Sequence, residues 1–226
     1  MTKPSFSTTR AQFAAGNFIR VVNYHSTPRS DAAELERELE GFARDYAPVT
    51  LEDLDRLFET GAWHHNKPGL IPVFYEGYRN SATVAAPLCE KFGLTGWFPI
   101  ATSFVDCAPD HQEAFARAHW ISLVEEDQQG GRIAMNWDEV AQLAARHVVF
   151  PHTAHHEGFD TVLDEADIRR EVVESKSALE AVTGQPAPAF VWLHGSSYGQ
   201  SPLHDRAVKE AGYRYQFANT MIHRVN

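Results

Sequence analysis

The chain has 226 residues, 43% of them hydrophobic and 22% charged, which is enough for one globular domain with a sizeable core. Its 20 Lys and Arg against 30 Asp and Glu give a formal net charge of -10, without any Lys/Arg-rich run, which argues against a nucleic-acid partner. The sequence shows neither the apolar segment of a signal peptide nor an apolar run long enough to span a membrane. We therefore expect a cytoplasmic protein that does not bind membranes.

Short apolar runs alternate with amphipathic helical patterns along the chain, which is typical of βα units and a parallel sheet. The expected strands are residues 18–23, 70–74, 97–100, 148–150, 189–193 and 213–218. After the first strand, Leu35, Leu39 and Phe42 share one helical face, and residues 50–53 resemble the capping box of a second helix. About six such strands predict an α/β fold, with the chemistry at their carboxyl ends.

The periodicity fades between residues 101 and 135, where Pro109, Gly130 and Gly131 interrupt it. We expect an insertion there, with one helix around residues 113–125. The sequence is expected to form one domain over residues 1–226, with an N-terminal extension at residues 1–17 and this insertion at residues 101–135.

Histidine is unusually frequent, with 12 residues, and a cluster of them directly follows the strand expected at 148–150. His152 and His156 are four residues apart, and two imidazoles at this spacing on one turn can bind a single divalent ion. A hydrogen-bonded or solvent-facing cluster is the alternative. His64 and His65 are interpreted as a polar loop rather than a second metal site.

Three segments, in the same order, resemble the motifs of the polysaccharide deacetylases, the NodB-like or carbohydrate esterase family 4 group. Residues 137–156 resemble the family segment that ends in His-[Ser/Thr]-x-x-His. Residues 73–79 lie where the family has Thr-Phe-Asp-Asp-Gly-Tyr, and residues 190–196 lie where it has Arg-x-Pro-Tyr-Gly. The resemblance implies a distorted (β/α) barrel of the NodB type, incomplete at its C-terminal end, because the sequence stops before the family's Leu-x-His motif.

This resemblance implies a metal-dependent hydrolase of a non-peptide C–N bond, such as an N-acetyl group on a sugar. It implies that Glu76, His152 and His156 hold a divalent ion, zinc or a similar metal. Tyr75 stands where the family has the carboxylate that acts as general base, and a phenol with a pKa of about 10 is a poor base at neutral pH. The catalytic set is therefore weakened.

Tyr75, His155, His194 and Gly195 are the residues expected to contact substrate. The expected partner is a small molecule or an oligosaccharide, and a homo-oligomer is compatible with the sequence. The alternative is a catalytically degenerate family member, a pseudoenzyme, which acts as a carbohydrate-binding or interaction protein. A metal-independent relative that hydrolyses cyclic amides is a third hypothesis.

Overall fold

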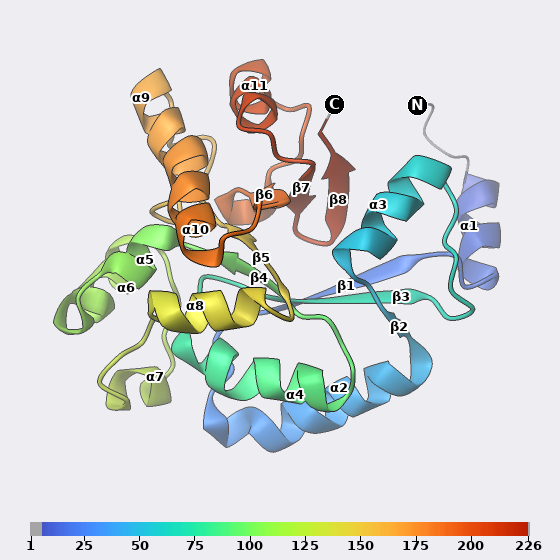
Figure 1. Ribbon diagram of the computed structural model, residues 1–226, viewed down its shortest axis with the longest axis horizontal. Coiled ribbons are helices and arrows are strands. Elements are labelled where there is room, and N and C mark those ends of the chain that lie inside the picture. Colours follow the sequence, from blue (N-terminus) through green and yellow to red (C-terminus); the bar gives the residue numbers. More distant parts are fainter. Residues whose placement is uncertain (1–5, 226) are drawn as a thin grey trace.

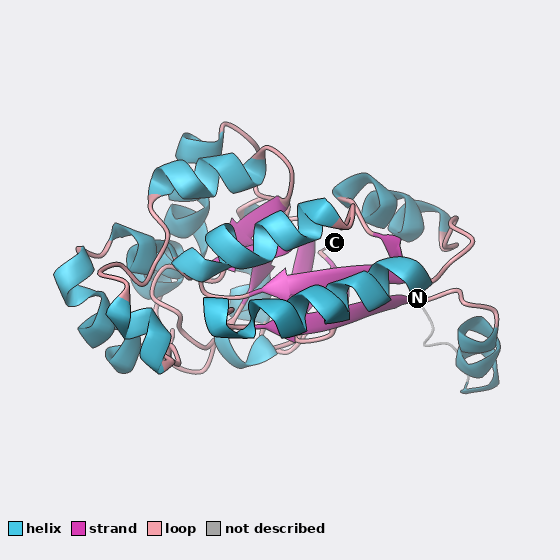
Figure 2. Ribbon diagram, turned by 90° about the horizontal axis from the view of Figure 1, so that it is seen from below, coloured by secondary structure: helices cyan, strands magenta, loops and turns pink. Residues whose placement is uncertain are grey.

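The computed structural model describes residues 6–225 and shows a mostly parallel sheet covered by helices (Figure 1, Figure 2). The strands are β1 (Ile19–Tyr24), β2 (Ala47–Pro48), β3 (Gly69–Phe74), β4 (Trp97–Ile100), β5 (Val148–Pro151), β6 (Ala189–Val191), β7 (Tyr215–Ala218) and β8 (Met221–Arg224). Residues 1–5 of the expected N-terminal extension, and Asn226, lie outside the described residues.

Eleven α-helices surround these strands within residues 6–225. They are α1 (Phe6–Ala14), α2 (Ala32–Asp45), α3 (Leu51–Thr60), α4 (Ala86–Lys91), α5 (Thr102–Asp106), α6 (Gln112–Ala118), α7 (Glu125–Gln129), α8 (Trp137–Ala144), α9 (Glu165–Ile168), α10 (Ser175–Thr183) and α11 (Pro202–Glu210). π-Helical turns at Ser81–Ala85 and Arg169–Glu174 lead into α4 and join α9 to α10. Among these described helices, none has the length and apolarity needed to cross a membrane.

The strands pair in two groups, which confirms the predicted α/β fold. The larger sheet has the order β1-β3-β4-β5, with β2 also paired to β3, and all of its pairs are parallel. The smaller sheet has the order β6-β7-β8, in which β6 and β7 are parallel and β8 is antiparallel. Over residues 6–225 no ladder pairing joins the two sheets into a closed barrel.

The central strands are buried on both faces, because helices cover one side and the smaller sheet lies against the other. Phe74 and Phe98 pack in one apolar cluster with Leu39 of α2. Val73 and Trp97, their neighbours along the same strands, pack in another cluster. Successive side chains of a strand point to opposite faces, so this division explains why the strands are continuous apolar runs in the sequence.

The capping box predicted at residues 50–53 is confirmed. Thr50 and Asp53 form a reciprocal capping box at the start of α3, and Asn136 forms the equivalent box at the start of α8. Gly184, with φ 66°, ends α10 in the left-handed conformation that glycine adopts without strain.

The single helix expected around residues 113–125 is wrong. Helix α6 ends at Ala118, because Trp120 adopts φ 59°, and a separate short helix, α7, begins at Glu125. Helices α5, α6 and α7 gather at one end of the molecule, with α1 at the opposite end (Figure 1). Because Ser103 N of α5 donates to Ala154 O at 2.9 Å, this segment is attached to the turn that follows β5.

Candidate metal centre

The carboxyl ends of β3 and β5 bring three ligand-type side chains together, and each is at most 3% exposed. Glu76 lies just after β3, and His152 and His156 lie in the turn after β5. Glu76 Oε1 is 3.4 Å from His156 Nε2 and 4.0 Å from His152 Nε2. One ligand atom from each residue lies within 4.8 Å of the others, so a single small cation can contact all three.

Main-chain carbonyls fix the orientation of both imidazoles. His152 Nδ1 lies 3.2 Å from Val191 O and donates to it, and His156 Nδ1 donates to His119 O at 2.6 Å. With the proton on Nδ1, each ring directs the lone pair of its Nε2 towards Glu76. Burial, followed by the neighbouring His156 imidazole, lowers the pKa of His152 to about 3, so this ring is neutral at pH 7.

These residues have the chemistry of a divalent metal site. His156 Nε2 is buried and has no hydrogen-bond partner within residues 6–225, which leaves a lone pair unused. Two imidazoles and one carboxylate form a common ligand set for catalytic zinc, whose bonds of about 2.0–2.1 Å place tetrahedral ligand atoms roughly 3.3 Å apart. The measured separations of 3.4 Å and 4.0 Å are close to that value.

Glu76 is ionised despite its burial. Burial alone raises the pKa of Glu76, but the imidazoles of His156 and His25 more than offset this effect and lower the pKa to about 2. A buried carboxylate that stays charged beside the neutral imidazole of His152 attracts a cation. The site therefore combines negative charge with nitrogen ligand atoms.

Backbone strain is concentrated at this centre. Glu76, Thr153, His156 and His194 all have φ between 58° and 68°, a conformation that non-glycine residues rarely adopt. Each of these four residues lies within a few positions of the end of β3, β5 or β6. Such strain costs about 1–3 kcal/mol per residue and persists where surrounding contacts hold the backbone, which is typical of functional sites.

Glu171, on the π-helical segment before α10, holds the histidine turn in place. Its buried carboxylate accepts hydrogen bonds from Ala154 N at 2.9 Å and from His155 N at 2.8 Å. His155 Nδ1 donates to the same carboxylate at 2.7 Å, while His155 Nε2 lies 3.2 Å from Ser103 Oγ. The His155 side chain remains 32% exposed and lines a cavity of about 370 Å³.

Replacing Glu171 by Ala should lower the free energy of unfolding by about 2–4 kcal/mol at pH 7, because two buried N–H groups lose their acceptor. Burial raises the pKa of Glu171, but its hydrogen bonds from His155 and from the backbone outweigh this and lower it. Because the pKa of Glu171 is lower in the folded protein, its carboxylate stabilises the folded state at pH values above the ordinary pKa of 4.5. This stabilisation is lost as the pH falls through the pKa of Glu171 in the folded protein. Urea unfolding should show a smaller difference in unfolding free energy between wild type and Glu171→Ala at pH 4 than at pH 7. Glu174→Ala, on the exposed face of the same segment, is the control. An equal loss for both variants would contradict this role.

The structure places the expected substrate-binding residues at different depths. Tyr75 is buried beside the metal centre, with its ring edge-on to His152 at 5.3 Å between centroids and its hydroxyl unpartnered among the described residues. Burial and the charge of Glu76 raise the pKa of Tyr75. His194 is exposed in the turn after β6. Gly195 packs on the β7–β8 turn, where a Cβ would lie 2.7 Å from Asn219 N.

His25 contacts the centre directly, and no role was predicted for it. Its Nδ1 lies 2.9 Å from both carboxylate oxygens of Glu76, and its ring stacks on Tyr75 with 5.6 Å between centroids. The hydrogen bond to Glu76 raises the pKa of His25. Its position after β1 is the signal that could have identified it, because all strand ends of a parallel sheet face one side.

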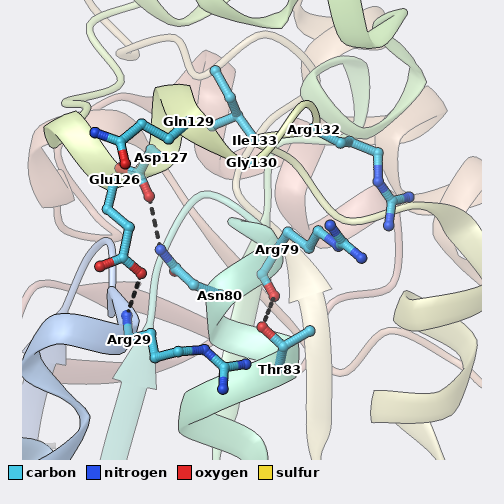
Figure 3. Close-up of a pocket in the computed structure, with 10 residues that line it drawn as sticks. All are labelled: Arg29, Arg79, Asn80, Thr83, Glu126, Asp127, Gln129, Gly130, Arg132 and Ile133. Atoms are coloured by element: carbon cyan, nitrogen blue, oxygen red, sulfur yellow. Dashed lines mark hydrogen bonds between the residues drawn. The ribbon is translucent and has the colours of Figure 1, made fainter.

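A second polar cavity, of about 330 Å³, lies beside the Arg79–Asn80 turn that follows Glu76 (Figure 3). Its wall is joined by hydrogen bonds between segments distant in sequence. Asn80 Nδ2 donates to Asp127 at 2.7 Å, and the Glu126 carboxylate accepts from Arg29 N at 2.6 Å (Figure 3). These bonds connect α7 to the loops after β1 and β3, so they support the loop that carries Glu76.

His64 and His65 also converge on a carboxylate. Both Nε2 atoms lie 2.9 Å from Asp53 Oδ1, which makes a second group of metal-ligand type. Asp53 already serves the capping box of α3, and the buried Nδ1 of His64 lacks the carbonyl partner that supports His152 and His156. The geometry therefore favours the metal centre at Glu76.

Comparison with known proteins agrees with the resemblance in the sequence. Residues 128–216 match the sequence profile of the family described as polysaccharide deacetylase. A solved de-N-acetylase from Aggregatibacter actinomycetemcomitans superposes with a TM-score of 0.68 at 15% identity, covering 92% of this chain and 91% of that one. This chain has the polysaccharide deacetylase fold. The profile match covers less than half of the chain, and together with the shared fold it agrees with the resemblance predicted from the sequence.

Two further deacetylase structures have the same fold. IcaB from Ammonifex degensii gives a TM-score of 0.65 at 17% identity and covers 91% of this chain and 87% of its own. The Streptococcus pyogenes deacetylase PplD, in complex with acetate, gives a TM-score of 0.66 at 12% identity, and the match covers 87% of this chain and 81% of PplD. No curated protein sequence matches the chain significantly. The match to the polysaccharide deacetylase profile includes His152 and His156 but not Tyr75 and Glu76.

Proposed function

We propose that this chain is a metal-dependent hydrolase of the deacetylase type, which cleaves the amide of an N-acylated sugar. The observation that carries the proposal is the convergence of Glu76, His152 and His156, with a buried Nε2 that lacks any partner among the described residues. The polysaccharide deacetylase fold, and the deacetylases that share it, support the class of reaction.

Glu76, His152 and His156 would hold the ion, for which zinc is the proposed identity. A bound divalent ion supplies Lewis acidity, which polarises an acyl carbonyl and lowers the pKa of water. The chain's own residues prepare the site for this. Carbonyl-fixed tautomers keep both imidazole Nε2 atoms available, and the lowered pKa of Glu76 keeps its carboxylate charged.

Tyr75, His155, His194 and Gly195 remain the proposed substrate contacts. A substrate oxygen would give the buried Tyr75 hydroxyl its missing partner, and His155 borders a cavity large enough for part of a sugar. An oligosaccharide is the proposed partner, and the cytoplasmic location stays a prediction.

The raised pKa of Tyr75 supports the second candidate function, a degenerate family member that binds carbohydrate without turnover. A phenol with a raised pKa cannot accept a proton near neutral pH. If the chain is a hydrolase, we expect hydrolysis to be slow. The proposed metal ligands are present, but Tyr75 replaces the carboxylate that would act as general base.

Acetate release from tetra-N-acetylchitotetraose tests this proposal. The protein loaded with zinc is expected to release acetate slowly. This release should stop after treatment with a strong chelator and should resume when zinc is restored. Binding of the oligosaccharide without acetate release would support the carbohydrate-binding alternative, and release that persists under chelation would support the metal-independent one.

A further inference from the structure

The turn that ends α6 carries a tryptophan where glycine is usual. Ile121 N donates to Ala116 O at 2.9 Å, which is the six-to-one hydrogen bond of a Schellman motif. Trp120 occupies the left-handed position of this motif, with φ 59°. Glycine is favoured there, because a Cβ crowds the backbone in this conformation.

The side chain does not compensate for this strain by burial, since Trp120 is 80% exposed. Six non-glycine residues in the described chain have positive φ; Glu76, Thr153 and His156 belong to the loops of the candidate metal centre, and His194 lies in the turn after β6. Asn219 is of a residue type that tolerates this conformation. Trp120 is the remaining case. A strained backbone that presents an apolar ring to solvent is better explained by function than by stability.

The neighbour of Trp120 connects this turn to the metal centre. His119 O accepts the hydrogen bond from His156 Nδ1 at 2.6 Å. The His119 ring packs near His155, with 5.7 Å between centroids, and both rings line the cavity of about 370 Å³. Trp120 is therefore one peptide bond from a residue that both orients a metal ligand and forms a wall of the cavity.

We propose that Trp120 is a specificity-determining platform on which a sugar ring of the substrate stacks beside the metal centre. The apolar face of an indole packs against the C–H groups of a pyranose ring, and its rigid side chain loses little entropy on binding. The adjoining cavity is polar, with Glu157, Thr161 and Arg170 in its lining, and provides partners for sugar hydroxyls. This inference rests on the proposed function in one respect only, which is that the ligand is a carbohydrate.

The test measures binding of tetra-N-acetylchitotetraose to the full chain by tryptophan fluorescence and calorimetry. Chelated protein is used, so that binding is read without hydrolysis, and zinc-loaded protein is compared. Trp63, Trp97 and Trp192 are buried and Trp137 is half-buried, so the part of the fluorescence change that Trp120→Phe removes is assigned to Trp120. Trp120→Gly should lower affinity roughly tenfold, as loss of an aromatic hot spot does. It should also leave the unfolding midpoint unchanged or raise it by about 2–4 °C, because strain is relieved.

Trp120→Phe should retain most of the affinity, since a flat aromatic face remains. Phe13→Ala, which removes an exposed aromatic side chain from α1 at the opposite end of the molecule (Figure 1), should leave affinity unchanged. Equal affinities of wild type and Trp120→Gly, or no binding by wild type in either state, would overturn the proposal. Binding that depends on Trp120 without acetate release would refute the proposed hydrolysis alone.

Discussion

His156→Ala is expected to lower the affinity for zinc by about 100-fold or more and to remove zinc-dependent acetate release. Loss of even a group that only supports a metal ligand typically costs 10–100-fold in affinity, and His156 supplies a ligand atom. The zinc-free protein should also lose some unfolding free energy, because the buried hydrogen bond from His156 Nδ1 to His119 O is removed. Competition titration with a zinc indicator measures the affinity.

The control for this change is His111→Ala, which removes an exposed imidazole from the turn before α6. It should bind zinc as tightly as wild type. If the two variants bind zinc with the same affinity, the ion is held elsewhere, and the cluster of Asp53, His64 and His65 becomes the site to examine next.

Tyr75→Asp should raise the rate of acetate release by the zinc-loaded protein by about 10²–10⁴-fold at neutral pH. A positioned general base contributes acceleration of this size, and Asp at this position would supply a carboxylate in place of a phenol. Burial and the charge of Glu76 raise the pKa of the phenol and make it ineffective in this role. Initial rates measured at saturating zinc give the comparison.

Tyr75→Asn is the matched variant, because it removes the aromatic ring in the same way but cannot accept the proton. The two variants should differ mainly in rate and only slightly in stability. Equal background rates for Asp and Asn would argue that this chain has lost more than its base, and would favour the carbohydrate-binding function.

The sequence predicted the positions of the strands and, through them, the location of the candidate centre. Apolar runs buried on both faces and helix caps such as Thr50 with Asp53 are local signals, and they identified β3 and β5 to within one residue. Because side chains after parallel strands meet at one edge of the sheet, the approach of Glu76 to His152 and His156 followed from those strands.

The remaining features depend on contacts between distant segments, which a sequence pattern does not carry. Nothing local distinguishes Trp120 from the next residue of a helix, so the helix that ends at Ala118 was expected to continue to about residue 125. The carbonyls of His119 and Val191 orient the imidazoles of His156 and His152 only after segments distant in the sequence have come together. The antiparallel strand β8 was not predicted either, because its four residues lack a clear alternation.

The most direct test of a metal centre is a crystal structure of zinc-soaked protein with anomalous diffraction measured on both sides of the zinc absorption edge. A single strong anomalous peak is expected within about 2.0–2.2 Å of Glu76 Oε1, His152 Nε2 and His156 Nε2. Full zinc occupancy at another position, with no peak among these three atoms, would contradict the metal centre.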